Sequence, residues 1–324
     1  MHKFNDVWTS YNLFFSVPFV QNFLKKRYQK LNYSDAEQHS FKNSYPFIYY
    51  LEHSKNYYQV AAQSPVSVQP VLLFYGMSQL LKASLLTQNP VYPENTAVLA
   101  HGVSTRKRKK QSYDFLDDEV KIQKSGLFSQ VGEELFHVKQ LEGSKYTMNY
   151  LLSCVPELET LFLNLDTRPF SHLTTIGSLP ATSLPIPEQV TRCYHMNHER
   201  LYSFLKERSR LSLSVSEDQV YILDPSNCLY NCSPFMYNFQ ANTLHAPLEK
   251  DSCLYFPEIL AHYLLLYNLS MISRYETEWW YELLHTYSSK DYPFILRFLE
   301  VTAQKIPYLI SCYLNEHTKK DWLK

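Results

Sequence analysis

The chain has 324 residues, and its 31 basic and 31 acidic side chains give a formal net charge of zero. No global field therefore steers it toward nucleic acid or an anionic membrane. Only 6 residues are glycine and no GxGxxG or GxxxxGK[ST] sequence occurs, which excludes nucleotide binding through Gly-rich phosphate loops. Hydrophobic residues make up 45%, as in ordinary globular proteins, but 27 Tyr and 19 Phe are unusually many.

The N-terminal stretch MHKFNDVWTSYNLFF has no continuous apolar region and no small-residue cleavage site, so it does not resemble a signal peptide. Six cysteines are few for this length, and without a secretion signal we expect them to be reduced. The longest unbroken apolar run in the most hydrophobic segment is 71–77, far short of a membrane span. These features predict a cytoplasmic protein with no membrane segment.

In the first 89 residues, apolar and aromatic residues recur at helical spacing from 7 to 30, and Pro18 inside this run should kink it or divide it into two short helices. Ser34 and Glu37 have the spacing of a capping box and predict the start of the next helix, which we expect Pro46 to bend or divide. Short connections between such segments are typical of a helical bundle.

The most hydrophobic segment is 70–86, PVLLFYGMSQLLKASLL. Pro70 suits a first helical position, and Asn89-Pro90 ends the helix because a residue before proline is disfavoured in the α region. Apolar residues on every side predict a helix buried in the core. Gly76 lowers helix propensity by roughly 1 kcal/mol relative to Ala, which indicates close approach of another backbone there.

Between 90 and 256 the pattern changes to a mixture of helices and strands. Alternation over 119–123 predicts a strand, and 190–196 and 219–223 are further strand candidates. Residues 198–208, HERLYSFLKER, predict a helix.

Helical spacing returns at Pro257, with one helix expected over about 257–284 and another over 292–314, interrupted at Pro307. We therefore predict a single domain, 1–324, of the α+β class and predominantly α-helical. In this fold, 1–89 and 257–324 pack as a bundle around the buried helix 70–86, and 90–256 forms a mixed α/β insertion or cap.

Five stretches resemble the YaaC-like family: 43–58, 69–86, 100–111, 118–128 and 269–280. The resemblance covers the whole chain and implies no established activity. Genes of this family often lie beside that of IMP dehydrogenase, so the resemblance implies a link to purine nucleotide metabolism, with IMP dehydrogenase as the candidate protein partner.

The central helix also resembles HEPN-type helical domains in its Y-G-M-x-x-x-x-K-A-x-L-L pattern. Many of those domains are metal-independent RNases with an R-x(4–6)-H motif. The resemblance implies two weak catalytic candidates: Arg192 with His198, which has the formal spacing, and Arg274 with His285, whose gap is too long.

The densest charge feature is a basic run shortly after His101. Adjacent cations repel one another, and an anionic partner such as RNA or a phosphorylated metabolite would relieve that repulsion. The alternative is a solvated loop neutralised by the acidic residues at 114–119. The candidate anion-binding residues are His101, Arg106, Lys107, Arg108, Lys109 and Lys110.

Arg274 falls on the apolar stripe of the helix expected over 257–284. A buried guanidinium is costly unless it is paired, and Glu278 lies four residues on, at helical contact distance. The pattern predicts a structural ion pair between Arg274 and Glu278; a ligand-binding or catalytic role for Arg274 is the alternative.

Cys228, Cys232, His245 and Cys253 are weak candidates for zinc ligands, because their spacing fits no common structural zinc site. We therefore expect no metal and no cofactor. Because no motif of hydrolases, metalloproteases or EF-hands occurs, we expect a non-catalytic binding or regulatory protein. The alternative is a HEPN-like metal-independent RNase or RNA-binding protein. Oligomeric state is left open.

Overall fold

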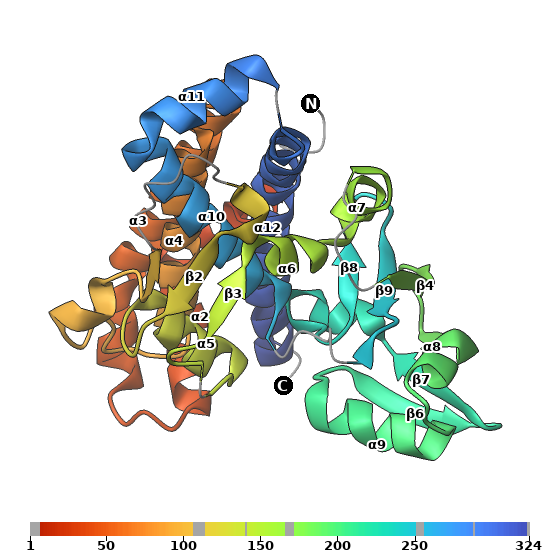
Figure 1. The fold of residues 1–324 in the computed structure, drawn as a ribbon. Coiled ribbons are helices and arrows are strands. Elements are labelled where there is room, and N and C mark those ends of the chain that lie inside the picture. Colours follow the sequence, from red (N-terminus) through yellow and green to blue (C-terminus); the bar gives the residue numbers. More distant parts are fainter. Residues whose placement is uncertain are drawn as a thin grey trace.

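The computed structural model describes residues 7–105, 114–139, 141–165, 172–250, 256–287 and 289–322, with side chains up to 318 in the last helix. It is α+β and predominantly α-helical, as the sequence predicts, and the described residues form three small antiparallel sheets (Figure 1). The N- and C-terminal parts supply the long helices: α2 (Val17–Lys30), α3 (Ala36–Gln63), α4 (Gln69–Leu86), α10 (Glu258–Tyr275), α11 (Thr277–Thr286) and α12 (Asp291–Trp322).

Helix α4 lies at the centre of this bundle, packed against α3, α10 and α12. Its buried residues lie on all sides, which confirms the central helix expected at 70–86. Gly76 does have close neighbours, but they are side chains of α3 rather than the backbone expected there: Ser54 Oγ donates to the Gly76 carbonyl at 2.8 Å. A Cβ atom on Gly76 would lie 2.9 Å from the Tyr58 ring, so only glycine fits without a shift.

Prolines lie in or next to three of the expected helical runs. The run 7–30 is divided, as expected, and Pro18 stands in the first turn of α2, after the short 3₁₀ helix η1 (Asn12–Phe15). Pro46 and Pro307 lie inside continuous helices, so the interruption predicted at Pro307 is wrong. Pro46 is exposed, and the carbonyl that loses its helical partner there can be hydrated.

The capping box predicted from Ser34 and Glu37 is wrong as well. Helix α3 begins one residue later than that pattern requires, with Asp35 at the N-cap position. The Glu37 carboxylate instead pairs with Lys25 of α2 at 2.9 Å.

The middle of the chain holds the three sheets. The first pairs β1 (Val103–Thr105), β2 (Glu119–Ile122) and β3 (Lys145–Thr147) in that order. The second has the order β4 (Leu173–Ser178), β9 (Thr243–Pro247), β8 (Met236–Asn238). The third has the order β5 (Ser183–Pro185), β7 (Gln219–Leu223), β6 (Ser212–Ser216).

Short helices connect these strands. They are η2 (Thr96–Leu99), η3 (Phe115–Asp117), α5 (Leu127–Phe136), α6 (Met148–Ser153), η4 (Pro156–Leu158), α7 (Glu159–Leu165), α8 (Glu188–Cys193), α9 (His198–Arg208) and η5 (Pro225–Asn231). The strands expected at 119–123 and 219–223 and the helix expected at 198–208 are confirmed. The strand expected at 190–196 is wrong: Val190 and Tyr194 are buried four residues apart, which is a helical spacing, and Pro187 precedes α8.

The two halves of the middle segment lie on different sides of the helices. The first sheet, with α5 and α6, packs against α4 and α10. The second and third sheets lie on the opposite side of α12 (Figure 1). Within the described ranges, no helix is long and apolar enough to cross a membrane.

Candidate functional site

Helices α3, α4 and α10 meet the loop 100–102 and together bring cationic and aromatic side chains to one place. We call this group the His101 cluster and define it as Lys82, His101 and Arg274 with the rings of His53, Tyr57, Tyr75 and Tyr267. Tyr75 and Lys82 of α4 are seven residues apart, and so are Tyr267 and Arg274 of α10. That spacing places a ring and a cation on one face of each helix, two turns apart.

The loop that holds His101 is fixed by a backbone crossing. Gly102 and Gly126 both have positive φ, +77° and +129°, and a Cβ on Gly126 would lie 2.4 Å from the Gly102 nitrogen. The first amides of α5 donate to this loop, from Leu127 to the Ala100 carbonyl at 2.7 Å and from Phe128 to the His101 carbonyl at 3.2 Å. The Tyr263 hydroxyl also donates to the His101 carbonyl, at 3.0 Å. His101 is therefore held on a rigid support.

The His101 imidazole is half-buried among aromatic rings. Ring centroids of Phe74, Tyr267 and Tyr75 lie 5.0, 5.7 and 6.2 Å from it. Burial lowers the pKa of His101 below its usual 6.5, and the positive charges of Arg274 and Lys82 lower it further. The side chain is therefore neutral at pH 7 and can donate or accept one hydrogen bond at each ring nitrogen.

Lys82 and Arg274 are half-buried cations, and among the described residues neither has an acidic partner. Burial lowers the pKa of Lys82, whose ammonium group lies 5.9 Å from the Tyr50 ring centroid. Arg274 Nε donates to the Ser270 carbonyl at 2.9 Å, and its guanidinium lies 5.3 Å from the Tyr275 ring centroid. No ion pair includes either cation in the part of the chain that the structure describes. Within the described ranges, positive charge thus converges here without a counter-charge, as an anion-binding site requires.

Aromatic rings continue the site along α3. The His53 and Tyr57 rings stack at 4.7 Å with an interplanar angle of 21°, and Tyr57 stacks on Tyr75 at 5.9 Å and 24°. His53 is exposed, while Tyr57 and Tyr75 are half-buried. Ring faces beside cations are the combination with which proteins bind the bases and phosphates of nucleotides.

The ion pair predicted between Arg274 and Glu278 is not formed. Helix α10 ends at Tyr275, and the backbone turns at Glu276 (φ −114°, ψ 47°) before α11 begins. The helical spacing that would have brought Glu278 to Arg274 is thereby lost. Glu278 is exposed in the first turn of α11, and Arg274 is only half-buried.

The two Arg–His pairs suggested as catalytic are placed in separate elements. Arg192 is exposed in α8, and His198 is the first residue of α9, with Nε2 buried and unpartnered. His285 is exposed near the end of α11 and stacks on Tyr281. Arg274 instead lies close enough to His101 for its positive charge to lower the pKa of that imidazole, which burial already lowers.

Of the predicted anion-binding residues, only His101 is described, because 106–110 lie outside the described residues. The run follows β1, whose last residue is Thr105. Asp118, one of the acids expected to neutralise the run, is buried instead, and its carboxylate accepts from Asn268 Nδ2 at 2.9 Å.

The possible zinc ligands form no described metal site. Cys253 lies outside the described residues, and Cys228 and Cys232 donate to the carbonyls of Asn231 and Phe235. His245 Nε2 is 2.8 Å from Thr243 Oγ1. Within the described ranges, no group of three His, Cys, Asp or Glu side chains is arranged to hold a metal ion.

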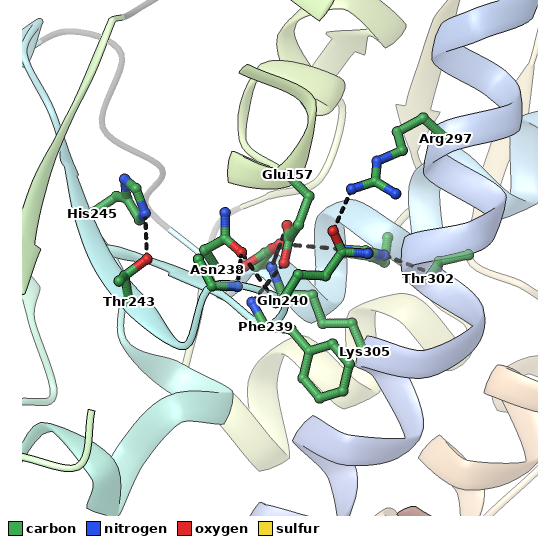
Figure 2. A network of polar contacts seen from close by, with 12 residues as sticks. Glu157, Asn238, Phe239, Gln240, Thr243, His245, Arg297, Thr302 and Lys305 are labelled. Atoms are coloured by element: carbon green, nitrogen blue, oxygen red, sulfur yellow. Dashed lines mark hydrogen bonds and ion pairs between the residues drawn. The ribbon is translucent and has the colours of Figure 1, made fainter. Parts of the chain in front are cut away.

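A second polar cluster, which the sequence does not reveal, lies around Lys305 of α12 (Figure 2). The Lys305 ammonium contacts the carboxylates of Glu157, at 2.9 Å, and Glu258. Glu258 also lies 3.2 Å from His262 Nε2. Burial alone would raise the pKa of Glu258, but Lys305 and His262 hold it below its usual value. Burial alone would lower the pKa of Lys305, but the two carboxylates raise it.

This cluster joins the middle of the chain to the helical core. Glu157 of η4 also accepts from the Phe239 amide at 2.7 Å, while Lys305 and Glu258 belong to α12 and α10 (Figure 2). The Lys305 and Glu157 side chains are 0% exposed. Because solvent and ligands do not reach these groups, we interpret the cluster as structural and the His101 cluster as the candidate functional site.

The comparisons with known proteins agree with the resemblance noted in the sequence. No curated protein and no solved structure matches the chain significantly. A family model described as YaaC-like Protein matches residues 12–314, nearly the whole chain and all of the helices that build the His101 cluster. The chain therefore belongs to the YaaC-like family.

Proposed function

We propose that this protein is a non-catalytic binding protein of the cytosol, and that the His101 cluster binds a phosphorylated ligand that contains an aromatic ring, such as a nucleotide. The observation that supports this most is the convergence of Lys82, Arg274 and His101, with neither Lys82 nor Arg274 in an ion pair among the described residues. A phosphate group would supply the missing negative charge and accept hydrogen bonds from all three side chains.

The ring part of the ligand is proposed from the stacked side chains beside the cations. Tyr57 and Tyr75 form a short stack that starts next to His101 and ends at the exposed His53. A base that stacks on such rings gains about 1–3 kcal/mol, whatever its identity. A mononucleotide, with its phosphate a few ångströms from its base, therefore suits this site better than an inorganic anion.

We further propose that a protein partner recognises the ligand-bound form of this protein, with IMP dehydrogenase as the candidate partner. A ligand of base and phosphate chemistry is compatible with purine nucleotide metabolism, to which the family resemblance points. Co-purification of the two purified proteins, with and without GMP, tests this part separately. Absence of a complex under both conditions would contradict the proposal of this partner but not the proposal of the ligand site.

Isothermal titration calorimetry with GMP, AMP, guanosine and inorganic phosphate tests the ligand site. We expect a nucleoside monophosphate to bind more tightly than either guanosine or phosphate, because it alone uses both parts of the site. Arg274→Ala and Lys82→Ala should each weaken binding at least tenfold, and Tyr75→Leu should weaken the nucleotide but not phosphate. Lys121→Ala, at an exposed lysine of β2, is the matched control. No detectable binding of either nucleotide at millimolar concentration would contradict the proposal.

RNA binding or cleavage is the second candidate, and the approach of Arg274 to His101 favours it. A neutral histidine can take up a proton from a ribose hydroxyl, and an arginine can stabilise the charge that develops on the phosphate. Incubation of the protein with labelled single-stranded RNA in the presence of EDTA separates this function from simple binding. Cleavage that His101→Ala abolishes would establish a ribonuclease activity. RNA that remains intact would contradict that activity and favour the non-catalytic binding function.

A further inference from the structure

The outer face of α3 carries a row of exposed aromatic side chains. Phe41, Tyr45 and Tyr49 follow one another at intervals of four residues and are 68%, 50% and 59% exposed. Side chains at this spacing lie on one helical face, and the Tyr45 and Tyr49 rings are 6.0 Å apart. Single exposed hydrophobic residues are normal on a protein surface, but a contiguous row indicates an interaction surface.

Two opposite charges flank this row. Lys42 precedes Tyr45 by three residues, and Glu52 follows Tyr49 by three. Both side chains are exposed, and neither belongs to an ion pair in the part of the chain that the structure describes. After Phe41, the order along the face is therefore cation, ring, ring, anion, and this part from Lys42 to Glu52 is symmetric about the level of Phe47.

We propose that this face binds a second copy of the same chain, with the two α3 helices antiparallel and a two-fold axis at the level of Phe47. In that arrangement Lys42 of each copy meets Glu52 of the other, and Tyr45 meets Tyr49. A two-fold interface uses the same surface on both copies and must be self-complementary, which this sequence of side chains is. Two ion pairs then flank an aromatic centre, the composition usual for protein interfaces.

The charge symmetry selects a second copy over an unrelated partner. A surface evolved for a different protein has no reason to place opposite charges at equal distances on either side of its centre. The inference does not depend on the ligand proposed for the His101 cluster.

Sedimentation equilibrium of the full chain tests the dimer through a charge reversal and its rescue. The wild-type protein should sediment at twice the 38.3 kDa chain mass at tens of micromolar. Lys42→Glu and Glu52→Lys alone should each weaken dimerisation at least tenfold, because like charges then meet twice in each dimer. The double variant, Lys42→Glu with Glu52→Lys, restores opposite charges and should regain the dimer.

Glu282→Lys, an exposed charge reversal on α11, is the matched control and should remain dimeric. Circular dichroism of all variants checks that the helices are retained, and Tyr45→Ala supplies a second test that leaves the charges in place. A wild-type protein that is monomeric at 100 micromolar, single reversals that dimerise as wild type does, or a double variant that stays monomeric would each overturn the proposal.

Discussion

The guanidinium of Arg274, at the end of α10, lowers the pKa of the His101 imidazole in the loop before β1. The two residues are far apart in the sequence, and neither has an acidic partner among the described ion pairs. The positive charge of Arg274 therefore disfavours protonation of His101 in the free protein, and a bound anion would favour it. The following predictions test this relationship and the framework that supports it.

Arg274→Ala should leave stability almost unchanged, within about 1 kcal/mol, because the guanidinium is half-buried and no buried carboxylate depends on it. The same substitution should raise the pKa of His101, since it removes one of the charges that lowers it. Thermal unfolding and an NMR titration of the histidine ring protons measure the two effects. A large loss of stability would instead support the structural role for Arg274 that the sequence suggests.

Lys305→Met should destabilise the protein by about 3–5 kcal/mol, because it leaves Glu157 and Glu258 buried without their shared cation. Urea unfolding measures the change. Lys25→Met is the matched control: Lys25 pairs with Glu37, whose side chain is 75% exposed, so its loss should cost less than about 1 kcal/mol. Equal costs for the two variants would show that the Lys305 cluster does not hold the middle segment to the core.

Asp291, at the start of α12, should make stability depend on pH. Burial and the neighbouring Asp114 carboxylate raise the pKa of Asp291 to about 6. The folded protein therefore binds this proton more tightly than the unfolded chain, and this group's contribution to stability is lost as the pH rises from about 4 to 6. The loss is roughly 3 kcal/mol for a shift of this size.

Asp291→Asn tests whether Asp291 causes the loss of stability between about pH 4 and pH 6. The amide mimics the protonated acid and can still accept from the Phe115 amide, which lies 3.1 Å from Asp291 Oδ2. The variant should be more stable than wild type at pH 7 and similar to it at pH 4. A wild-type pH profile that Asp291→Asn leaves unchanged would contradict the assignment.

Gly76→Ala should destabilise the protein by about 1–3 kcal/mol, although Ala favours helices, because the new Cβ would lie 2.9 Å from the Tyr58 ring and 3.2 Å from Tyr57 Cβ. Gly132→Ala in α5 is the matched control. Its Cβ would meet its nearest neighbour at 3.8 Å, so it should stabilise the helix by roughly 0.5–1 kcal/mol. Thermal unfolding of both variants measures these changes in stability. Stabilisation by Gly76→Ala would contradict the close contact between position 76 and the Tyr58 ring.

The buried helix α4 could be predicted because its evidence is local: proline at each end, apolar residues on every side and one glycine. The end of α10 could not, because no proline or glycine marks the turn at Glu276 and the apolar spacing runs on through it into α11. For the same reason the sequence suggested Glu278 as a partner for Arg274. Local periodicity shows which residues share a helical face only as long as the helix continues.

The candidate site was only partly predictable. His101 and Arg274 each stood out, one beside a basic run and the other on an apolar stripe, but their proximity depends on the crossing of Gly102 over Gly126 and on helix packing. The repeated seven-residue spacing of tyrosine and cation, in 75–82 and 267–274, was the sequence signal that could have joined them. The Lys305 cluster had no such signal, because its members come from η4, α10 and α12.

The most direct test of the account is an NMR titration of the protein, with labelled histidine and tyrosine side chains, by GMP. We predict that the His101, Tyr57 and Tyr75 resonances shift together and saturate at one ligand equivalent. The His262 resonance, which belongs to the enclosed Lys305 cluster, should not move. Shifts that spare His101, or no shift at millimolar GMP, would contradict the assignment of this cluster as the binding site.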